Sequence, residues 1–299
     1  MLQDFDLHIH SNKSDGKLSV EQILTLLRIK DIHTFSITDH DNIESIKILK
    51  KLDLSGLTCI LGVEMSVRTK NYKAHILGYG INGDCSKIIE LCDIVKNTRI
   101  ERLYKMVEYL RKKFNIEINK TIINEIIRKK IETNTSMSER RDLGEVLIDL
   151  GICRSQKEAN EKYLEYDDYL PKYRVDARDV INAIHSAEGK AILAHPILLE
   201  KKYDIDITQI IDEFIEIGID GIEVFNSKHK NGDCTRYYSL ALQKGLLISG
   251  GSDFHREPNT YMGMITGDEK GIKIDKKFIS ILNNVSTLDT INNEQRDER

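Results

Sequence analysis

The first residues in this sequence that could do chemistry are His8 and His10, two histidines separated by one isoleucine. The alternating run that ends in them is typical of a strand, and side chains two apart on a strand point to the same face. The pair could therefore bind a divalent metal through two imidazoles. An isolated His-x-His also fits a half-buried strand that carries two structural histidines, so further ligands must decide between these interpretations.

More histidines and carboxylates follow the expected ends of later strands. Two candidates depart from that rule, because Asp15 lies in the loop after His10 and His75 lies near the start of its strand. The complete candidate set is His8, His10, Asp15, His40, Glu64, His75, His195, Asp253 and His255. Six imidazoles and three carboxylates can complete two or three divalent-metal sites with open positions, and an N/O set without thiolate suits Mn, Fe or Zn. Structural histidines scattered through the fold would not gather at strand ends in this way.

The elements that must position these residues alternate between strands and helices. Strands are expected at 3–10, 34–41, 57–62, 73–80, 190–194, 221–226 and 246–255, and helices at 20–29, 43–52, 177–187, 207–217 and 235–244. Capping boxes, Ser19 with Gln22 and Asp41 with Glu44, are expected to start the first two helices. Seven strands, most followed by a helix, favour a parallel barrel or a strongly curved parallel sheet, with the chemistry at the strand ends.

The middle of the chain has a different pattern, since residues 84–176 show helical periodicity only. Helices are expected at 84–114, 121–130, 142–150 and 156–166. The predicted organisation is a barrel domain of residues 1–83 and 177–285, an inserted helical subdomain of residues 84–176, and a flexible tail at 286–299.

Composition excludes several classes of function. A net charge of −4 argues against a long nucleic-acid footprint, so any nucleic-acid partner should be small. The five cysteines are scattered without a Cys-x-x-Cys motif, which suits reduced thiols in a cytoplasm, and none is placed like a ligand. No apolar run approaches the roughly 18 residues of a membrane span, and the first strand leaves no room for a signal peptide. A cytoplasmic protein without membrane contact is expected.

The order of the ligand motifs resembles the polymerase and histidinol phosphatase (PHP) family. The matching segments, between residues 4 and about 265, are His8-Ile-His10, the Asp15 loop, Thr38-Asp39-His40-Asp41, Gly62-Val-Glu64, His75-Ile-Leu-Gly-Tyr, Leu193-Ala-His195-Pro196 and Gly250-Gly-Ser-Asp253-Phe-His255. The resemblance implies an α/β fold, a distorted (β/α)7 barrel with an inserted helical subdomain. It also implies a trinuclear metal site held by the nine candidates, with Glu64 as the bridging carboxylate.

The helical insertion resembles the branch that acts on nucleoside 3′,5′-bisphosphates and trims short RNA from the 5′ end. The match implies substrate-binding roles for Arg99, Arg102, Arg140 and His229. A solvated helix face for the arginines and a surface loop for His229 remain alternatives. Relatives carry Gly-Arg-Pro-His where this chain reads Glu139-Arg140-Arg141-Asp142, and this departure leaves the substrate identity open.

The function expected from this set is metal-dependent hydrolysis of phosphate esters. A hydroxide that bridges the metals would attack phosphorus in line, so no protein nucleophile is needed. The expected substrates are nucleoside 3′,5′-bisphosphates or short oligonucleotides. One alternative is a phosphatase for histidinol phosphate or another small phosphomonoester, and a second, of a different class, is a non-catalytic metal-binding module. His33 and His185 are interpreted as structural, and nothing in the sequence indicates an oligomeric state.

Overall fold

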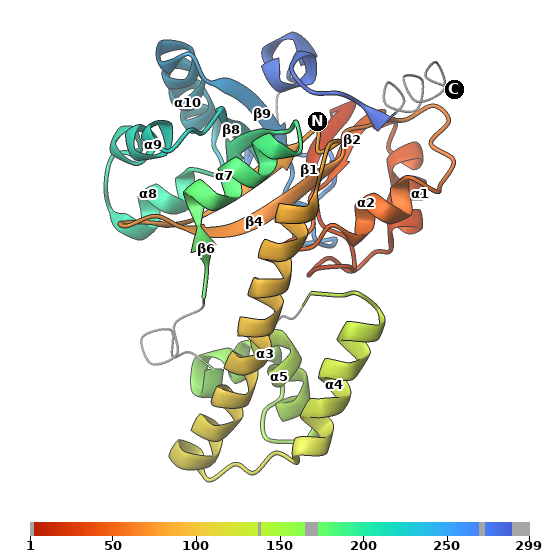
Figure 1. Ribbon diagram of the computed structural model, residues 1–299, viewed down its shortest axis with the longest axis vertical. Helices are drawn as coiled ribbons and strands as arrows, with labels where there is room; N and C mark the ends of the chain where they lie inside the picture. Colours follow the sequence, from red (N-terminus) through yellow and green to blue (C-terminus); the bar gives the residue numbers. More distant parts are fainter. Residues whose placement is uncertain (1–2, 137–138, 165–172, 269–272, 289–299) are drawn as a thin grey trace. The chain divides into compact units, whose positions relative to one another are not determined.

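The computed structural model describes residues 3–136, 139–164, 173–268 and 273–288. The chain divides into two compact units, residues 1–91 together with 175–299, and residues 92–174 (Figure 1). The sequence indicates domain limits at 84 and 176, whereas the helix α3 (Ser86–Phe114) begins in the first unit and continues into the second.

The first unit is built on two sheets that join into a barrel. One contains β1 (Phe5–Ile9), β2 (Thr34–Ile37) and β3 (Thr58–Cys59), and the other has the order β6 (Val175–Asp176), β4 (Gly62–Arg68), β5 (Lys73–Tyr79), β7 (Lys190–Leu193), β8 (Gly221–Asn226) and β9 (Leu247–Gly251). The sheets meet at two isolated bridges, His40 with Glu64 and Ile9 with Phe254. A distorted seven-stranded barrel, as expected from the sequence, is therefore confirmed for β1, β2, β4, β5, β7, β8 and β9.

The seam between β1 and β9 depends on a glycine. A Cβ atom on Gly251 would lie 2.4 Å from the backbone nitrogen of His8, closer than any side chain permits. The strands can therefore approach here, and the amide of His10 donates to the carbonyl of Phe254 at 2.8 Å while the amide of Phe254 donates to the carbonyl of His8 at 3.1 Å. The first strand of the barrel, β1, and the last, β9, are therefore neighbours.

The barrel is not all parallel, which corrects the expectation from the sequence. β5 runs antiparallel to both β4 and β7. A tight turn joins β4 to β5, with the amide of Thr69 donating to the carbonyl of Tyr72 at 2.7 Å, and only antiparallel strands can be joined so directly. The strand expected at 57–62 is in fact two strands, β3 and the start of β4. Glu64 therefore lies inside β4 rather than beyond a strand end.

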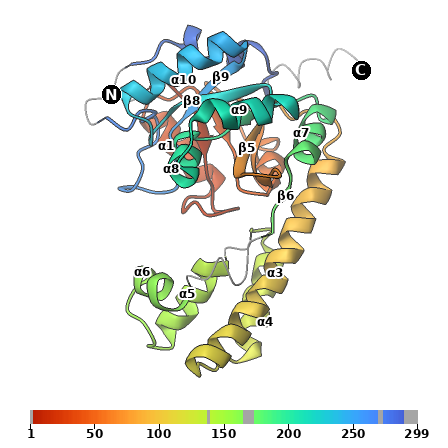
Figure 2. The same ribbon diagram turned by 90° about the vertical axis from the view of Figure 1, so that its left-hand side faces the viewer.

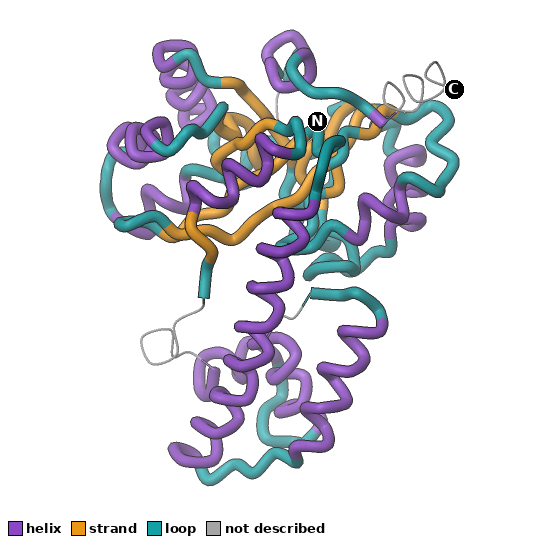
Figure 3. The backbone as a smooth tube through the Cα atoms, viewed as in Figure 1, coloured by secondary structure: helices purple, strands orange, loops and turns teal. Residues whose placement is uncertain are grey.

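The helices of the first unit surround the strands (Figures 2 and 3). They are α1 (Val20–Ile29), α2 (Glu44–Leu49), α7 (Ala177–Ser186), α8 (Ile197–Tyr203), α9 (Ile207–Glu216) and α10 (Asn231–Lys244). The capping box of Ser19 and Gln22 is confirmed at α1. The box expected from Asp41 is wrong, because Asp41 accepts the amide of Ser66 at 2.7 Å instead, and the amide of Glu44 in α2 donates to Oδ1 of Asn42 at 2.8 Å. α8 is not foreseen by the sequence analysis.

The second unit is helical, as the sequence indicates. After α3 come α4 (Lys120–Glu132), α5 (Glu139–Asp149) and α6 (Gln156–Ala159), the last continuing as a π-helical turn over Asn160–Leu164. These helices share a core of their own, which includes Leu103, Met106, Leu110, Ile123, Leu143 and Leu147. The expected end of the last helix at residue 166 and most of the expected flexible tail lie outside the described residues. Within the described ranges, no helix is long and apolar enough to cross a membrane.

Candidate metal centre

Glu64 is the residue on which the candidate ligands converge. Its Oε1 atom is 3.0 Å from Nδ1 of His75 and 3.1 Å from Nε2 of His195. Its Oε2 atom is 3.1–3.2 Å from one nitrogen each of His8, His10 and His40. A single fully buried carboxylate on β4 is thus contacted by five imidazoles from four other parts of the barrel.

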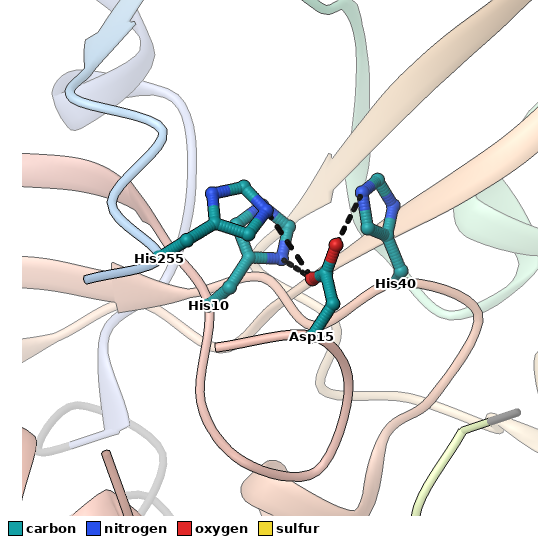
Figure 4. Close-up of side chains that lie close together, drawn as sticks. All are labelled: His10, Asp15, His40 and His255. Carbon is teal, nitrogen blue, oxygen red and sulfur yellow. Dashed lines mark ion pairs between the residues drawn. The ribbon is translucent and has the colours of Figure 1, made fainter. Parts of the chain in front are cut away.

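Asp15 joins a second set of imidazoles at the edge of the cluster (Figure 4). Its Oδ1 atom lies 3.2 Å from Nε2 of His255 and 3.6 Å from Nδ1 of His10, while its Oδ2 atom lies 4.0 Å from Nε2 of His40. The loop after β1 therefore places this carboxylate beside three histidines. Asp15 can thus join the cluster although it lies outside any strand.

Asp253, just beyond β9, completes the cluster. Its Oδ1 atom is 3.2 Å from Nε2 of His10 and 3.5 Å from the nearest nitrogens of His8 and His255. Potential ligand atoms lie within 4.8 Å of one another in three overlapping groups: His10, Asp15, His40 and His255; His8, His10, Glu64 and Asp253; and His40, Glu64 and His75. With His195 beside Glu64, all nine candidate ligands are brought together.

The donor atoms in this cluster fit bound cations. Nε2 of His8, Nε2 of His10 and Oε2 of Glu64 are buried and make no hydrogen bond to any described residue, although each imidazole nitrogen is 3.2 Å from the carboxylate oxygen. Buried polar atoms without hydrogen bonds are rare and call for an ion or water. Nitrogen and oxygen donors without thiolate fit Mn, Fe or Zn, so the cluster can hold the metals expected from the sequence.

The electrostatics of the cluster also favour a cation. Burial alone would raise the pKa of Glu64, but the imidazoles of His40, His8 and His75 outweigh it and hold that pKa well below its usual value. Burial would likewise lower the pKa of His8, yet Glu223 and Glu64 raise it to about 10. The ionised carboxylates need positive charge in this buried site, which protonated imidazoles supply and which a bound cation can supply in their place.

Two aspartates beside His40 hold the surrounding backbone. Asp39 accepts hydrogen bonds from the amide and hydroxyl of Ser11 at 2.8 and 2.6 Å and from the hydroxyl of Ser14 at 2.6 Å. It thereby fixes the loop that carries Asp15. The amide of Asp41 donates to the carbonyl of Glu64 at 2.8 Å, next to the carboxylate that binds five imidazoles. Both contacts hold backbone that carries or adjoins candidate ligands.

Two of the candidate ligands have strained backbone. His195 has φ of 30° and Asp253 has φ of 56°, values in the left-handed region that non-glycine residues rarely adopt. Such conformations cost about 1–3 kcal/mol each and persist where the surrounding structure enforces them. Other non-glycine residues with positive φ, such as Asp31 and Asn115, follow helix ends and are not candidate ligands, whereas His195 and Asp253 carry candidate ligand atoms.

Two residues at the cluster are not found by the sequence analysis. Glu223 on β8 is fully buried and lies 2.9 Å from Nδ1 of His8. Lys228, in the loop after β8, forms an ion pair with Asp253. The available signals were a charged residue inside the apolar run Gly221–Asn226 and a cation close after it, but neither signal identifies a partner.

The candidate substrate-binding arginines all belong to the helical unit. Arg102 is only 5% exposed and lies 3.5 Å from Oε1 of Glu139, so the solvated-face alternative is wrong for this residue. Arg99 and Arg140 are half-buried. Asp142, which replaces the family histidine, is 3.1 Å from Nζ of Lys130. The departures at 139 and 142 therefore place two carboxylates against basic side chains of this unit.

His229 lies in the barrel unit but outside the cluster of nine. It is fully buried, so the surface-loop alternative is wrong. Its Nδ1 is 2.8 Å from the carbonyl oxygen of Val224, its ring packs edge-on against Tyr237, and burial lowers its pKa to about 4. With Nδ1 held by this carbonyl, Nε2 is the ring nitrogen left to contact a phosphate, and that role of His229 stays a prediction.

The chain resembles known proteins over most of its length. The model of the PHP domain matches residues 6–217, more than half of the chain. The 5′-3′ exoribonuclease Rnm of Escherichia coli is 28% identical, with 84% of this chain and 85% of the relative covered. The 3′,5′-nucleoside bisphosphate phosphatase of Chromobacterium violaceum is 26% identical over 85% of this chain and 88% of its own. The phosphoribosyl 1,2-cyclic phosphate 1,2-diphosphodiesterase of Eggerthella lenta is 26% identical over 84% and 93%.

Solved structures show the same architecture. An amidohydrolase from Chromobacterium violaceum superposes with a TM-score of 0.70 at 26% identity, covering 87% of this chain and 90% of that one. A protein from Bifidobacterium adolescentis, described as a metal-dependent phosphoesterase, superposes with a TM-score of 0.73 at 22% identity over 95% of this chain and 97% of its own. The second likeness concerns the fold alone.

Proposed function

This chain belongs to the PHP domain family, and we propose that it is a metal-dependent phosphoesterase that releases phosphate from nucleoside 3′,5′-bisphosphates or trims short oligonucleotides from the 5′ end. The observation that carries the proposal is the convergence of five imidazoles on the buried carboxylate of Glu64. No candidate ligand is missing or turned away from the cluster. A degenerate, non-catalytic domain would be expected to have lost some of them.

The nine residues are proposed to hold two to three divalent metals, with Glu64 bridging and Mn, Fe or Zn as the candidates. The chemistry that such metals supply when bound is activation of water near neutral pH and neutralisation of charge on the phosphoryl oxygens. The chain itself positions the ligands, because Asp39 fixes the Asp15 loop and the strained turns place His195 and Asp253. Burial of the carboxylates strengthens their interaction with a cation.

The proposed substrate class is supported by the named relatives, which act on a nucleoside bisphosphate or on RNA from its 5′ end. A cyclic phosphodiester is a second candidate, because the Eggerthella lenta relative is of comparable identity and carries that name. Asp142 also supports this alternative, because a carboxylate stands where the bisphosphate branch carries a histidine, and a carboxylate repels a second phosphate.

A substrate panel with added Mn tests the function. Adenosine 3′,5′-bisphosphate, a 5′-phosphorylated short oligoribonucleotide, a ribose 1,2-cyclic phosphate, histidinol phosphate and p-nitrophenyl phosphate would be compared by kcat/KM. We expect the bisphosphate or the oligonucleotide to be the best substrate. A higher kcat/KM for the cyclic phosphodiester or for histidinol phosphate would replace the proposed substrate, and no turnover of any ester would refute the enzyme assignment.

We propose that Arg99, Arg102 and Arg140 recognise the phosphate that does not react, and Arg140→Ala is the sharpest test. Loss of a guanidinium contact to phosphate should lower kcat/KM for adenosine 3′,5′-bisphosphate by roughly 10- to 100-fold. Hydrolysis of p-nitrophenyl phosphate should barely change. The control is Arg128→Ala, which removes an exposed arginine paired with Glu125 and Glu132. Equal losses on both substrates in Arg140→Ala would remove this residue from recognition.

Arg102→Ala is a less selective variant for this purpose. Because Arg102 is buried beside Glu139, its removal would leave a buried carboxylate without this partner and destabilise the helical unit. Any kinetic effect of Arg102→Ala must therefore be compared with its melting temperature.

Lys228 is proposed to bind the reacting phosphoryl group. Its ammonium contacts Asp253, and when that carboxylate is committed to a metal the ammonium becomes available to a phosphoryl oxygen. Lys228→Met should raise KM for phosphomonoesters by about 10-fold and weaken inhibition by inorganic phosphate to a similar degree. The matched control is Lys230→Met, two residues along the same loop, where the side chain is exposed. Unchanged phosphate inhibition in Lys228→Met would contradict this role.

A further inference from the structure

Glu223 connects two candidate metal ligands that belong to different parts of the barrel. Its Oε1 atom is 2.9 Å from Nδ1 of His8 on β1, and its Oε2 atom accepts the backbone amide of His195, after β7, at 2.7 Å. All atoms of its side chain are buried. We propose that Glu223 is a positioning residue, which aims the imidazole of His8 and fixes the turn at His195, and so sets the affinity of the centre for metal.

The contact to His8 determines which ring nitrogen faces the cluster. An imidazole that donates its Nδ1–H to a carboxylate presents Nε2 as the ligand atom, and such a contact also makes the ligand more basic. Nε2 of His8 faces Glu64 at 3.2 Å and Asp253 at 3.5 Å, on the other side of the ring from Glu223. This nitrogen makes no hydrogen bond to a described residue, so a metal would bind it in place of a proton.

The contact to His195 acts on the backbone. His195 has a left-handed φ of 30°, which a histidine adopts only when its surroundings enforce it. The carboxylate of Glu223 holds the amide of this residue in place, while Nε2 of His195 points to Glu64 at 3.1 Å. The side chain of Glu223 thereby restrains both the imidazole ring of His8 on β1 and the strained backbone of His195 after β7.

Glu223 is not placed as a metal ligand itself. The ring of His8 separates it from Glu64, and it belongs to none of the three groups of ligand atoms found among the described residues. Both of its oxygens already accept an N–H. The two contacts need two acceptor oxygens on one side chain. A carboxylate has both, whereas glutamine has one oxygen and one NH2 group and could accept only one of the two N–H groups with its oxygen.

The test is the metal affinity of Glu223→Gln, measured on the full chain without substrate. Metal would be removed with a chelator, and Zn or Mn would be titrated back against a competing indicator. We expect the dissociation constant to rise about 10- to 100-fold, the range typical when the partner of a ligating histidine is removed. The absorption spectrum of the Co-loaded protein should also change, because the orientation of His8 affects its ligand field.

Glu200→Gln is the matched control. Glu200 is a largely buried carboxylate that binds Arg236 and the hydroxyl of Tyr237, and touches none of the nine candidate ligands. Its substitution should lower the melting temperature of the chelated protein without changing metal affinity. Equal loss of affinity in both variants would overturn the proposal, because a general loss of stability would then explain it. If Glu223→Gln does not fold, Glu223→Asp, which retracts the carboxylate by one methylene, should raise the dissociation constant above that of the wild type, and an unchanged constant would overturn the proposal.

The inference rests on the proposed metal-dependent function, and the titration separates the two. A wild-type chain that binds no metal would overturn the proposed function and this inference with it. Wild-type binding that is retained unchanged in a folded Glu223→Gln variant would overturn the role of Glu223 alone.

Discussion

Removal of divalent metal should abolish phosphate release and lower the melting temperature of the protein. Nine buried or half-buried ligand residues face one another, and the carboxylates of Glu64 and Asp253, with oxygens within 4.8 Å of one another, repel more strongly when no cation lies between them. A metal that binds only the folded chain stabilises it by about 2.7 kcal/mol when the free metal is 100-fold above Kd. The protein purified with Mn, Fe or Zn present should contain two to three equivalents per chain by elemental analysis.

Reconstitution provides the control for this experiment. Mn, Fe or Zn returned singly to the chelated protein should restore both turnover and the melting temperature. Mg or Ca should restore less, because nitrogen-rich sites disfavour these hard cations. Less than one equivalent of metal together with full activity in EDTA would refute the metal-dependent mechanism.

Replacement of Glu64 by glutamine should have the largest effect of any single substitution at the site. The carboxylate contacts five imidazoles, so Glu64→Gln removes a charge and an acceptor from all of them. The loss in kcat should exceed the roughly 10- to 100-fold that follows from altering a partner of a ligand, and metal content should fall with it. His40→Ala and Asp253→Ala should each lower kcat by roughly 10²-fold or more.

The control for Glu64→Gln is Glu44→Gln, in the first turn of α2, where the carboxylate pairs only with Lys47 among the ion pairs described. This variant should retain wild-type turnover and metal content. Circular dichroism should be unchanged in both. Near wild-type kcat in a folded Glu64→Gln variant would show that Glu64 does not bridge the metals.

The features that the sequence predicts correctly are those set by neighbours along the chain. The capping box at α1 needs only Ser19 and Gln22, three residues apart. The apolar residues Ile207, Ile210, Ile211 and Phe214 recur at helical spacing and are buried on one face of α9. His8 and His10 face one way because alternation along a strand is local. The motifs could therefore be assigned to elements before any tertiary contact was known.

The features that the sequence misses depend on pairing between distant segments. Asp41 has the spacing of a helix cap with Glu44, but the amide of Ser66 competes for its carboxylate once β4 lies beside it. The direction of β5 is set by the short turn that joins it to β4. The charged pairs of the helical unit, such as Lys130 with Asp142, likewise form between helices that the sequence treats separately.

The sequence by itself determined the alternation of strands and helices, the inserted helices and the nine potential ligands, because periodicity and motif spacing are properties of short segments. Only the tertiary structure decided that Glu64 lies inside a strand with five imidazoles around it, and that Glu223 connects His8 to His195. The charge of Glu223 within an apolar strand signals a buried partner, but not which one. That choice is made by the closing of the barrel, which brings β1 and the end of β7 to opposite sides of one carboxylate.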